Sequence, residues 1–136
     1  MADSARVTGG CECGRISGGP FLPFVDFKKK DIEWTTKPDT YSSSGDAERG
    51  FCKVCGSTLT MTYHFQEDSL GVTLGSLDRV CGFVPETKYH IFVKDKPAWF
   101  QIPDDGLPRH QEFNDNDRYQ QGLKQWRESH PKEEVK

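Results

Sequence analysis

The 136-residue chain is expected to fold as a mainly β domain that ends in a single helix. Between residues 21 and 101, short runs rich in β-branched and aromatic residues are separated by turn-forming residues, which is typical of antiparallel strands. Near residue 117 the spacing of the apolar residues changes to the period of a helix. We therefore expect an antiparallel sheet pair or sandwich, rather than alternating strands and helices, followed by a C-terminal helix.

The clearest strand candidate is Thr58–Tyr63, in which apolar and hydroxyl side chains alternate. Leu59, Met61 and Tyr63 face one side and threonines face the other, which predicts a half-buried antiparallel strand. Phe21–Phe27 alternates in the same way and is rich in aromatic residues. Further strand candidates are Ile32–Trp34, Thr40–Ser43, Leu70–Leu77, Lys88–Val93 and Ala98–Ile102.

The C-terminal segment from Asp117 to about Ser129 has the pattern of an amphipathic helix. Tyr119, Leu123 and Trp126 fall at positions i, i+4 and i+7, which is one stripe of a helix. Gly122 costs this helix about 1 kcal/mol relative to alanine, so the helix is expected to need docking onto the sheet. We expect one domain over residues 9–130, a flexible N-terminus over 1–8 and a charged tail over 131–136.

The composition indicates a thin hydrophobic core. Apolar residues make up 34% of the chain and its net charge is -3. A thin core is commonly reinforced by a disulfide or a metal, and the acidic balance argues against a nucleic-acid or anionic membrane partner. Neither a signal peptide nor a membrane-spanning run is evident. We therefore expect a soluble cytoplasmic protein whose cysteines are metal ligands or reactive thiols rather than disulfides.

Four of the five cysteines form two closely spaced pairs. Cys11 and Cys13 lie in a C-x-C-G motif, and Cys52 and Cys55 lie in a C-x-x-C-G motif. Zinc prefers four soft ligands in a tetrahedron, and a short spacer lets one turn present two thiolates to the same ion. The two pairs therefore predict one structural zinc site. A redox role is the alternative for the second pair, but the βαβ context of such motifs is absent; iron is a further alternative to zinc.

The remaining chemically active residues are scattered. Cys81 is expected to be a small apolar residue or a surface thiol. None of the four histidines forms a ligand pair, and each is expected to be a strand or surface residue rather than a catalytic base, with His90 as the least unlikely exception; the four are His64, His90, His110 and His130. Asp104 and Asp105 lie in a predicted turn, where aspartate is expected for backbone reasons.

Several motifs follow one another in an order that is itself informative. They are Gly10–Gly14, Ser17–Phe21, Arg49–Ser57, Gly75–Asp78, His90–Phe92, Pro97–Trp99 and Asp105–Pro108. In this order they resemble the family of glutathione-dependent formaldehyde-activating enzymes and centromere protein V, over roughly residues 9 to 112. The resemblance implies a zinc-bound β-tent fold. It also implies that the structural zinc ligands are Cys11, Cys13, Cys52 and Cys55.

The chain departs from this family at the segment after Cys13. Members usually carry a further C-x-C-x-x-C-R motif there, which holds a second zinc with an open coordination position. In this chain Cys13 leads almost directly into Ser17–Phe21, so that motif and the strand before it are missing. In another alignment Cys13 is the last cysteine of the second motif and the first motif is absent. We favour the first alignment because it leaves a complete tetrahedral site. A deletion or splice junction that falls within both motifs explains why each of the two alignments fits in part.

The resemblance implies a carbon–sulfur lyase that joins glutathione, as co-substrate, to formaldehyde and gives S-hydroxymethylglutathione. An open zinc deprotonates a thiol, but four cysteines close the coordination shell. The activity on small thiol adducts or electrophiles is therefore expected to be impaired, and whether the chain is an enzyme stays open. The alternative is a non-catalytic, zinc-stabilised β module that binds a protein or small-molecule partner. A third reading is a truncated isoform with an exposed sheet edge.

Overall fold

Seven strands form one mixed sheet in the computed structural model, which describes residues 5–9, 19–77, 85–113 and 117–131. The strands are β1 Ala5–Gly9, β2 Phe21–Lys28, β3 Asp39–Ser44, β4 Ala47–Phe51, β5 Thr58–Tyr63, β6 Ser69–Thr73 and β7 Thr87–Ile91. Their order across the sheet is β3-β4-β5-β6-β2-β1-β7. Every neighbouring pair is antiparallel except β1 and β7, which run parallel. The prediction of a mainly β fold is thus confirmed, whereas the expected pair of antiparallel sheets is instead one sheet with a parallel pair of strands at its edge.

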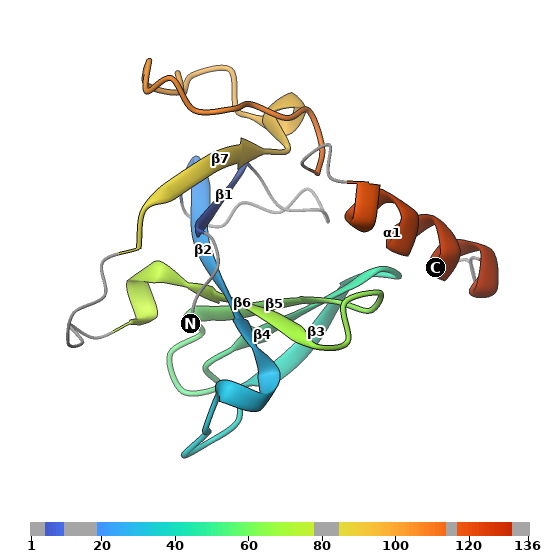
Figure 1. The fold of residues 1–136 in the computed structure, drawn as a ribbon. Coiled ribbons are helices and arrows are strands. Elements are labelled where there is room, and N and C mark those ends of the chain that lie inside the picture. The colour runs from blue at the N-terminus through green and yellow to red at the C-terminus, as the bar shows by residue number, and fades with distance from the viewer. Residues whose placement is uncertain (1–4, 10–18, 78–84, 114–116, 132–136) are drawn as a thin grey trace.

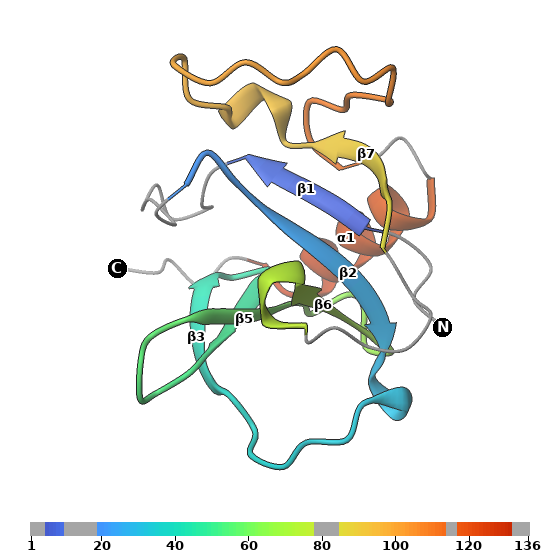
Figure 2. The ribbon, with the colours of Figure 1, turned by 90° about the vertical axis from the view of Figure 1, so that its left-hand side faces the viewer.

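Strand β2 connects the two parts of the sheet. It pairs with β6 on one side and with β1 on the other, and both views show it running from the β3–β6 part to the part that holds β1 and β7 (Figures 1 and 2). Neighbouring residues of a strand point to opposite faces, yet Phe24 and Val25 are only 2% and 1% exposed. Strand β2 is therefore covered on both faces, although its sequence predicts burial on one side.

The main apolar cluster lies against β2, β4 and β5. Its buried members are Phe24, Ala47, Met61 and Tyr63, with Leu22, Phe65 and Phe113 packed around them. Phe113 makes edge-on ring contacts with Tyr63 and Phe92 at centroid distances of 5.0 and 4.9 Å. These contacts fix the segment that follows β7 against the sheet, because edge-to-face aromatic pairs add to the free energy of burial.

The strand predictions succeeded where apolar and polar residues alternate and failed beside prolines and 3-10 turns. Three are confirmed: Phe21–Phe27, Thr40–Ser43 and Thr58–Tyr63. Two were too long, because the chain enters short 3-10 helices at Leu74–Ser76 and Val93–Asp95. Two were wrong, because Ile32–Trp34 and Ala98–Ile102 contain no strand residues. Strand β1 was not predicted at all.

The prediction that β5 is half-buried holds only in part, because its threonine face is buried at Thr60, while Thr58 and Thr62 are partly exposed. Thr60 is 5% exposed and lies directly across from Gly50 of β4. A Cβ atom built on Gly50 would lie 2.0 Å from Thr60 Oγ1. The absence of a side chain at Gly50 therefore lets the Thr60 hydroxyl occupy that space.

The predicted C-terminal helix is present as α1, Asp117–Ser129, and it packs beside the end of the β4–β5 part of the sheet (Figure 1). Arg127 forms an ion pair with Asp46, and the Trp126 ring stacks on His64 at 5.5 Å. A Cβ on Gly122 would approach Phe65 to 3.2 Å, so this glycine allows the helix to come close. Among the described residues, none of the helices has the length and apolar character needed to cross a bilayer.

Candidate functional site

The turn between β4 and β5 presents two cysteines on one tight loop. Cys52 N–H donates to Ser57 O at 2.9 Å, and Gly56 N–H donates back to Cys52 O at 2.7 Å. Gly56 has φ +77°, a left-handed conformation that glycine adopts without steric cost. The C-x-x-C-G sequence therefore folds as a compact knuckle at the end of the hairpin.

The two thiols of this knuckle interact with each other and with Ser57. Cys55 is exposed and Cys52 partly buried. The Ser57 hydroxyl, 3.1 Å from Cys55 Sγ, lowers the pKa of Cys55, and the Ser57 backbone and the Cys52 thiol act in the same direction. Because the thiolate is the form that binds metals, the loop favours the ligating state of Cys55.

This knuckle fits half of a tetrahedral zinc site. It supplies two soft donors from one turn, which is the chemistry that structural zinc requires. Cys11, Cys13 and Cys81 lie outside the described residues, so the predicted partner pair is not placed here. Within the ranges that the structure does describe, no cluster of three or more histidine, cysteine or acidic side chains is arranged to hold a metal.

The strand register brings the flanks of the two cysteine pairs to the same end of the sheet. Gly9, the last residue of β1, pairs with Phe21 at the start of β2. Further along β2, Phe24 pairs with Thr73 at the end of β6, and Thr73 Oγ1 donates to Thr58 O, at the start of β5, at 3.0 Å. Gly9, two positions before Cys11 in the sequence, therefore lies at the sheet end where the knuckle lies.

A second constellation joins β7 to the loop that follows it. His90 Nε2 lies 2.7 Å from Asp105 Oδ2, and the histidine is 7% exposed. The backbone of Leu107 donates to Asp105 Oδ1 at 3.0 Å. This hydrogen bond, followed by the one from His90, lowers the pKa of Asp105. The carboxylate therefore stays ionised and accepts a hydrogen bond from His90 Nε2.

His90 and Asp105 line a cavity of about 220 Å³. Most of its wall is apolar, and the Phe21 and Phe100 rings meet there with a centroid distance of 5.4 Å. Lys96 also lines the cavity, and its ammonium group donates to Phe100 O at 2.5 Å and to Pro97 O at 3.2 Å. A small pocket with apolar walls and a few converging polar groups is typical of a ligand site.

From the sequence, His90 was expected to be a strand or surface residue and was kept only as the least unlikely catalytic base, and the partner of His90 was not found. Asp105 was assigned to a turn, and the two residues are 15 positions apart. They meet because the loop returns along β7: His90 N–H donates to Pro108 O and His110 N–H donates to His90 O, both at 2.9 Å. No sequence pattern signals that return, so the pair becomes visible only in the folded chain.

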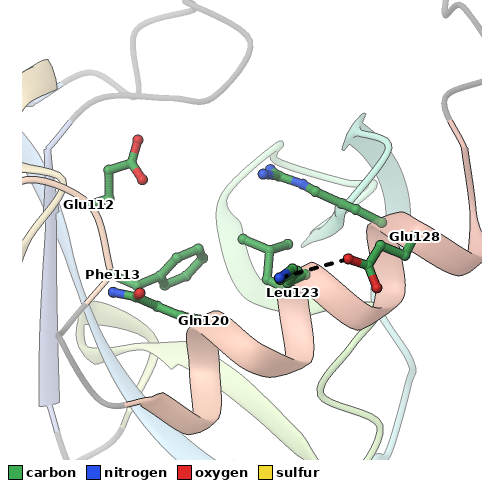
Figure 3. A pocket seen from close by; sticks show the side chains of 7 residues that line it. Glu112, Phe113, Gln120, Leu123 and Glu128 are labelled. Atoms are coloured by element: carbon green, nitrogen blue, oxygen red, sulfur yellow. Dashed lines mark ion pairs between the residues drawn. The ribbon is translucent and has the colours of Figure 1, made fainter.

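A larger hollow of about 420 Å³ lies between α1 and the segment around Phe113 (Figure 3). Its walls carry long charged side chains, among them Glu112, Arg127 and the ion-paired Lys124 and Glu128. Neither histidine nor cysteine is found among the described residues that line it, so we assign it no chemistry.

Comparison with known proteins gives two results. Residues 5–95 match the family described as glutathione-dependent formaldehyde-activating enzyme. A protein of Schizosaccharomyces pombe named as an uncharacterized lyase is 41% identical over 54 residues. That alignment spans 39% of this chain and 39% of the yeast protein, well under half of either.

Proposed function

Since the chain belongs to the family of glutathione-dependent formaldehyde-activating enzymes, we propose that it is a zinc-binding member that acts on carbon–sulfur bonds of small thiol adducts. The proposal that the chain binds zinc rests on the knuckle, in which one tight turn holds Cys52 and Cys55 beside each other. The lyase chemistry draws on the family description and on the name of the yeast relative.

The zinc ligands in this proposal are Cys11, Cys13, Cys52 and Cys55. This pairing is supported by the position of Gly9 at the sheet end that carries the knuckle, because only one residue, Gly10, separates Gly9 from Cys11. A four-cysteine zinc supplies a structural cross-link when bound. In this chain the cross-link would tie the N-terminal segment to the β4–β5 hairpin, adding stability that a thin core lacks.

The reaction in this proposal is the reversible joining of glutathione to formaldehyde as a hydroxymethyl thioether, or the same step on a related small adduct. A zinc with four cysteine ligands has no open position, so protein side chains have to supply any proton transfer. A non-catalytic β module that binds a partner remains the alternative, and the activity measurement below distinguishes the two.

The zinc proposal is tested by metal analysis of the purified chain by mass spectrometry. We expect one zinc per chain, its loss in Cys55→Ser together with a lower Tm, and its retention in the control Cys81→Ser. Two zinc ions per chain would contradict the favoured alignment. A chain that folds with no zinc would contradict the structural site.

The activity is tested by exchange NMR of glutathione and formaldehyde at equilibrium with their adduct. We expect the exchange rate to rise in proportion to the concentration of zinc-loaded protein. If zinc-loaded protein leaves the exchange rate at its uncatalysed value, the lyase proposal is wrong and the non-catalytic module is favoured.

A further inference from the structure

The His90 side chain is unusual because it is buried with one ring nitrogen unused. Nε2 is hydrogen-bonded to Asp105, whereas Nδ1 is buried and has no hydrogen-bond partner among the described residues. A buried polar atom without a partner destabilises the folded state, because it has lost its hydrogen bonds to water. Native proteins contain few such atoms, and each calls for an explanation.

The tautomer of the neutral His90 ring follows from its neighbours. Because the ionised Asp105 carboxylate accepts a hydrogen bond from Nε2, the neutral ring carries its proton on Nε2 and has its lone pair on Nδ1. Two other charged groups act here: Lys96 lines the same cavity, and Arg109 acts on Asp105 by Coulomb attraction. The arrangement of a carboxylate that orients a histidine is the one that general-base catalysis uses.

The cavity limits the kind of ligand. Its volume of about 220 Å³ is below the roughly 300–1,000 Å³ of pockets for drug-sized ligands, so it suits a small thiol compound or the thiol-bearing end of a peptide. Its apolar wall fits the carbon–sulfur segment. Lys96 uses two of its three N–H groups on the carbonyl oxygens of Pro97 and Phe100, and its positive charge favours a departing thiolate.

We propose that this cavity binds hydroxymethyl thioethers and that His90, held by Asp105, is the base that accepts the proton of their hydroxyl group. The binding site stands on the geometry alone, and the reaction rests on the proposed function. Because Nδ1 is buried without a partner among the described residues and His90 lines the cavity, the ligand hydroxyl in this proposal supplies the missing hydrogen bond, which couples binding to proton acceptance.

The reaction balances without any further reactant. The hydroxyl proton passes to Nδ1, the electron pair of the O–H bond forms the C=O bond of the aldehyde, and the C–S bond breaks with its electron pair on sulfur. The thiolate then takes the proton from the imidazolium, which restores neutral His90. Asp105 is a positioning residue in this scheme, because it holds the ring through Nε2.

Binding is tested with a stable matched pair of probes, S-(2-hydroxyethyl)glutathione and S-ethylglutathione, by titration followed in ¹H–¹⁵N NMR spectra. We expect shifts at cavity residues such as Ile91, Phe100 and Ile102. The hydroxyl probe should bind about 2–10-fold more tightly, as one neutral hydrogen bond allows. In His90→Phe this preference should vanish, while the control His64→Phe should keep it. Equal affinities in the wild type, or shifts elsewhere, would overturn the site.

Catalysis is tested by the exchange NMR assay on zinc-loaded variants. We expect His90→Phe and His90→Gln to lower the protein-dependent rate by about 10²-fold or more, which is typical of a lost general base. Asp105→Asn should lower kcat and displace the pH profile with little change in KM. His64→Phe should stay within about twofold, and zinc content and Tm confirm that each variant is folded.

The two proposals fail in distinguishable ways. If the wild type is active and both His90 variants keep its rate, the role of His90 is wrong while the lyase function stands. If the zinc-loaded wild type is inactive, the lyase function and the reaction at His90 both fall, and the binding experiment alone decides whether the cavity is a ligand site.

Discussion

Gly50 and Thr60 show how one missing side chain determines the packing of two strands. A Cβ on Gly50 would lie 2.0 Å from Thr60 Oγ1 and 3.2 Å from Pro38 Cβ. Thr60 is β-branched and therefore stiff at χ1, and it is buried. Rotation of the Thr60 side chain cannot relieve the contact with an added Cβ atom, so the backbones of β4 and β5 would have to separate.

We expect Gly50→Ala to lower the free energy of unfolding by about 1–3 kcal/mol, the usual cost of overpacking. The matched control is Gly45→Ala in the adjoining turn, where an added Cβ meets no atom within 4 Å. Urea denaturation of both variants measures the difference. Equal stability of the two variants would show that the close approach at Gly50 is not a constraint.

Asp105 is a residue whose charge stabilises the folded chain. The Leu107 backbone hydrogen bond and the His90 contact lower its pKa in the folded state. A carboxyl whose pKa is depressed by folding contributes stability above its unfolded pKa, near 3.9. That contribution is lost as the pH falls through the folded value.

We therefore expect the Tm difference between the wild type and Asp105→Asn to be constant from pH 6 down to about pH 5 and to shrink below about pH 4. Asp104→Asn removes the same charge one position earlier in the same loop and is the control. Thermal unfolding followed by circular dichroism gives both curves. A Tm difference that grows on acidification would have the wrong sign for this account.

The helix α1 depends on the sheet for its stability. Its 13 residues are marginal as an isolated helix, and Gly122 weakens it further. Trp126 stacks on His64 at 5.5 Å and on His130 at 4.5 Å. Arg127 reaches Asp46 through both Nε and a terminal nitrogen, but a half-exposed ion pair adds only about 0–1 kcal/mol. The aromatic stack is therefore expected to dominate docking.

We expect Trp126→Ala to increase hydrogen exchange throughout α1 while protection in β5 changes little. Trp126→Phe keeps an aromatic face against His64 and should retain most of the protection. Lys124→Ala, which removes an exposed side chain from the same helix, serves as the second control. Hydrogen exchange measured by mass spectrometry on peptides from α1 and β5 separates these outcomes. Equal loss in both elements would mean that the helix and the sheet unfold together.

The sequence predicted the elements that carry their own periodicity. The alternation in Thr58–Tyr63 and the helical stripe before Ser129 depend on neighbours in the chain, and both elements are present. The knuckle was also predictable, because C-x-x-C-G encodes its own turn. Strand β1 was missed because five residues, ARVTG, form a strand only through pairing with β2 and β7.

Long-range contacts set the features that the sequence did not predict. Strand β7 ends early because Phe92 adopts φ 54°, a left-handed conformation that is uncommon outside glycine. The loop after it returns to place Asp105 on His90. The burial of Thr60 likewise depends on Gly50 across the sheet. The zinc site remains a prediction, because Cys11 and Cys13 lie outside the described residues.

At the scale of the whole molecule, β2 is the element through which the two parts of the sheet are connected. Its central residue Val25 is 1% exposed and lies between Ala5 of β1 and Val72 of β6. Both parts of the sheet therefore share its packing. This sharing makes the unfolding of the chain cooperative. If β2 separated from one part of the sheet, apolar surface of the other part would also be exposed.

We expect Val25→Ala to lower the free energy of unfolding by about 2 kcal/mol, from the two lost methyl groups and the cavity they leave. Unfolding should remain a single transition, and hydrogen exchange should increase equally in β5 and β7, because both depend on β2. Lys28→Ala, at the exposed end of the same strand, should change stability by no more than about 0.5 kcal/mol. Two separate transitions in Val25→Ala, or loss of protection confined to β7, would show that the two parts of the sheet fold as independent units.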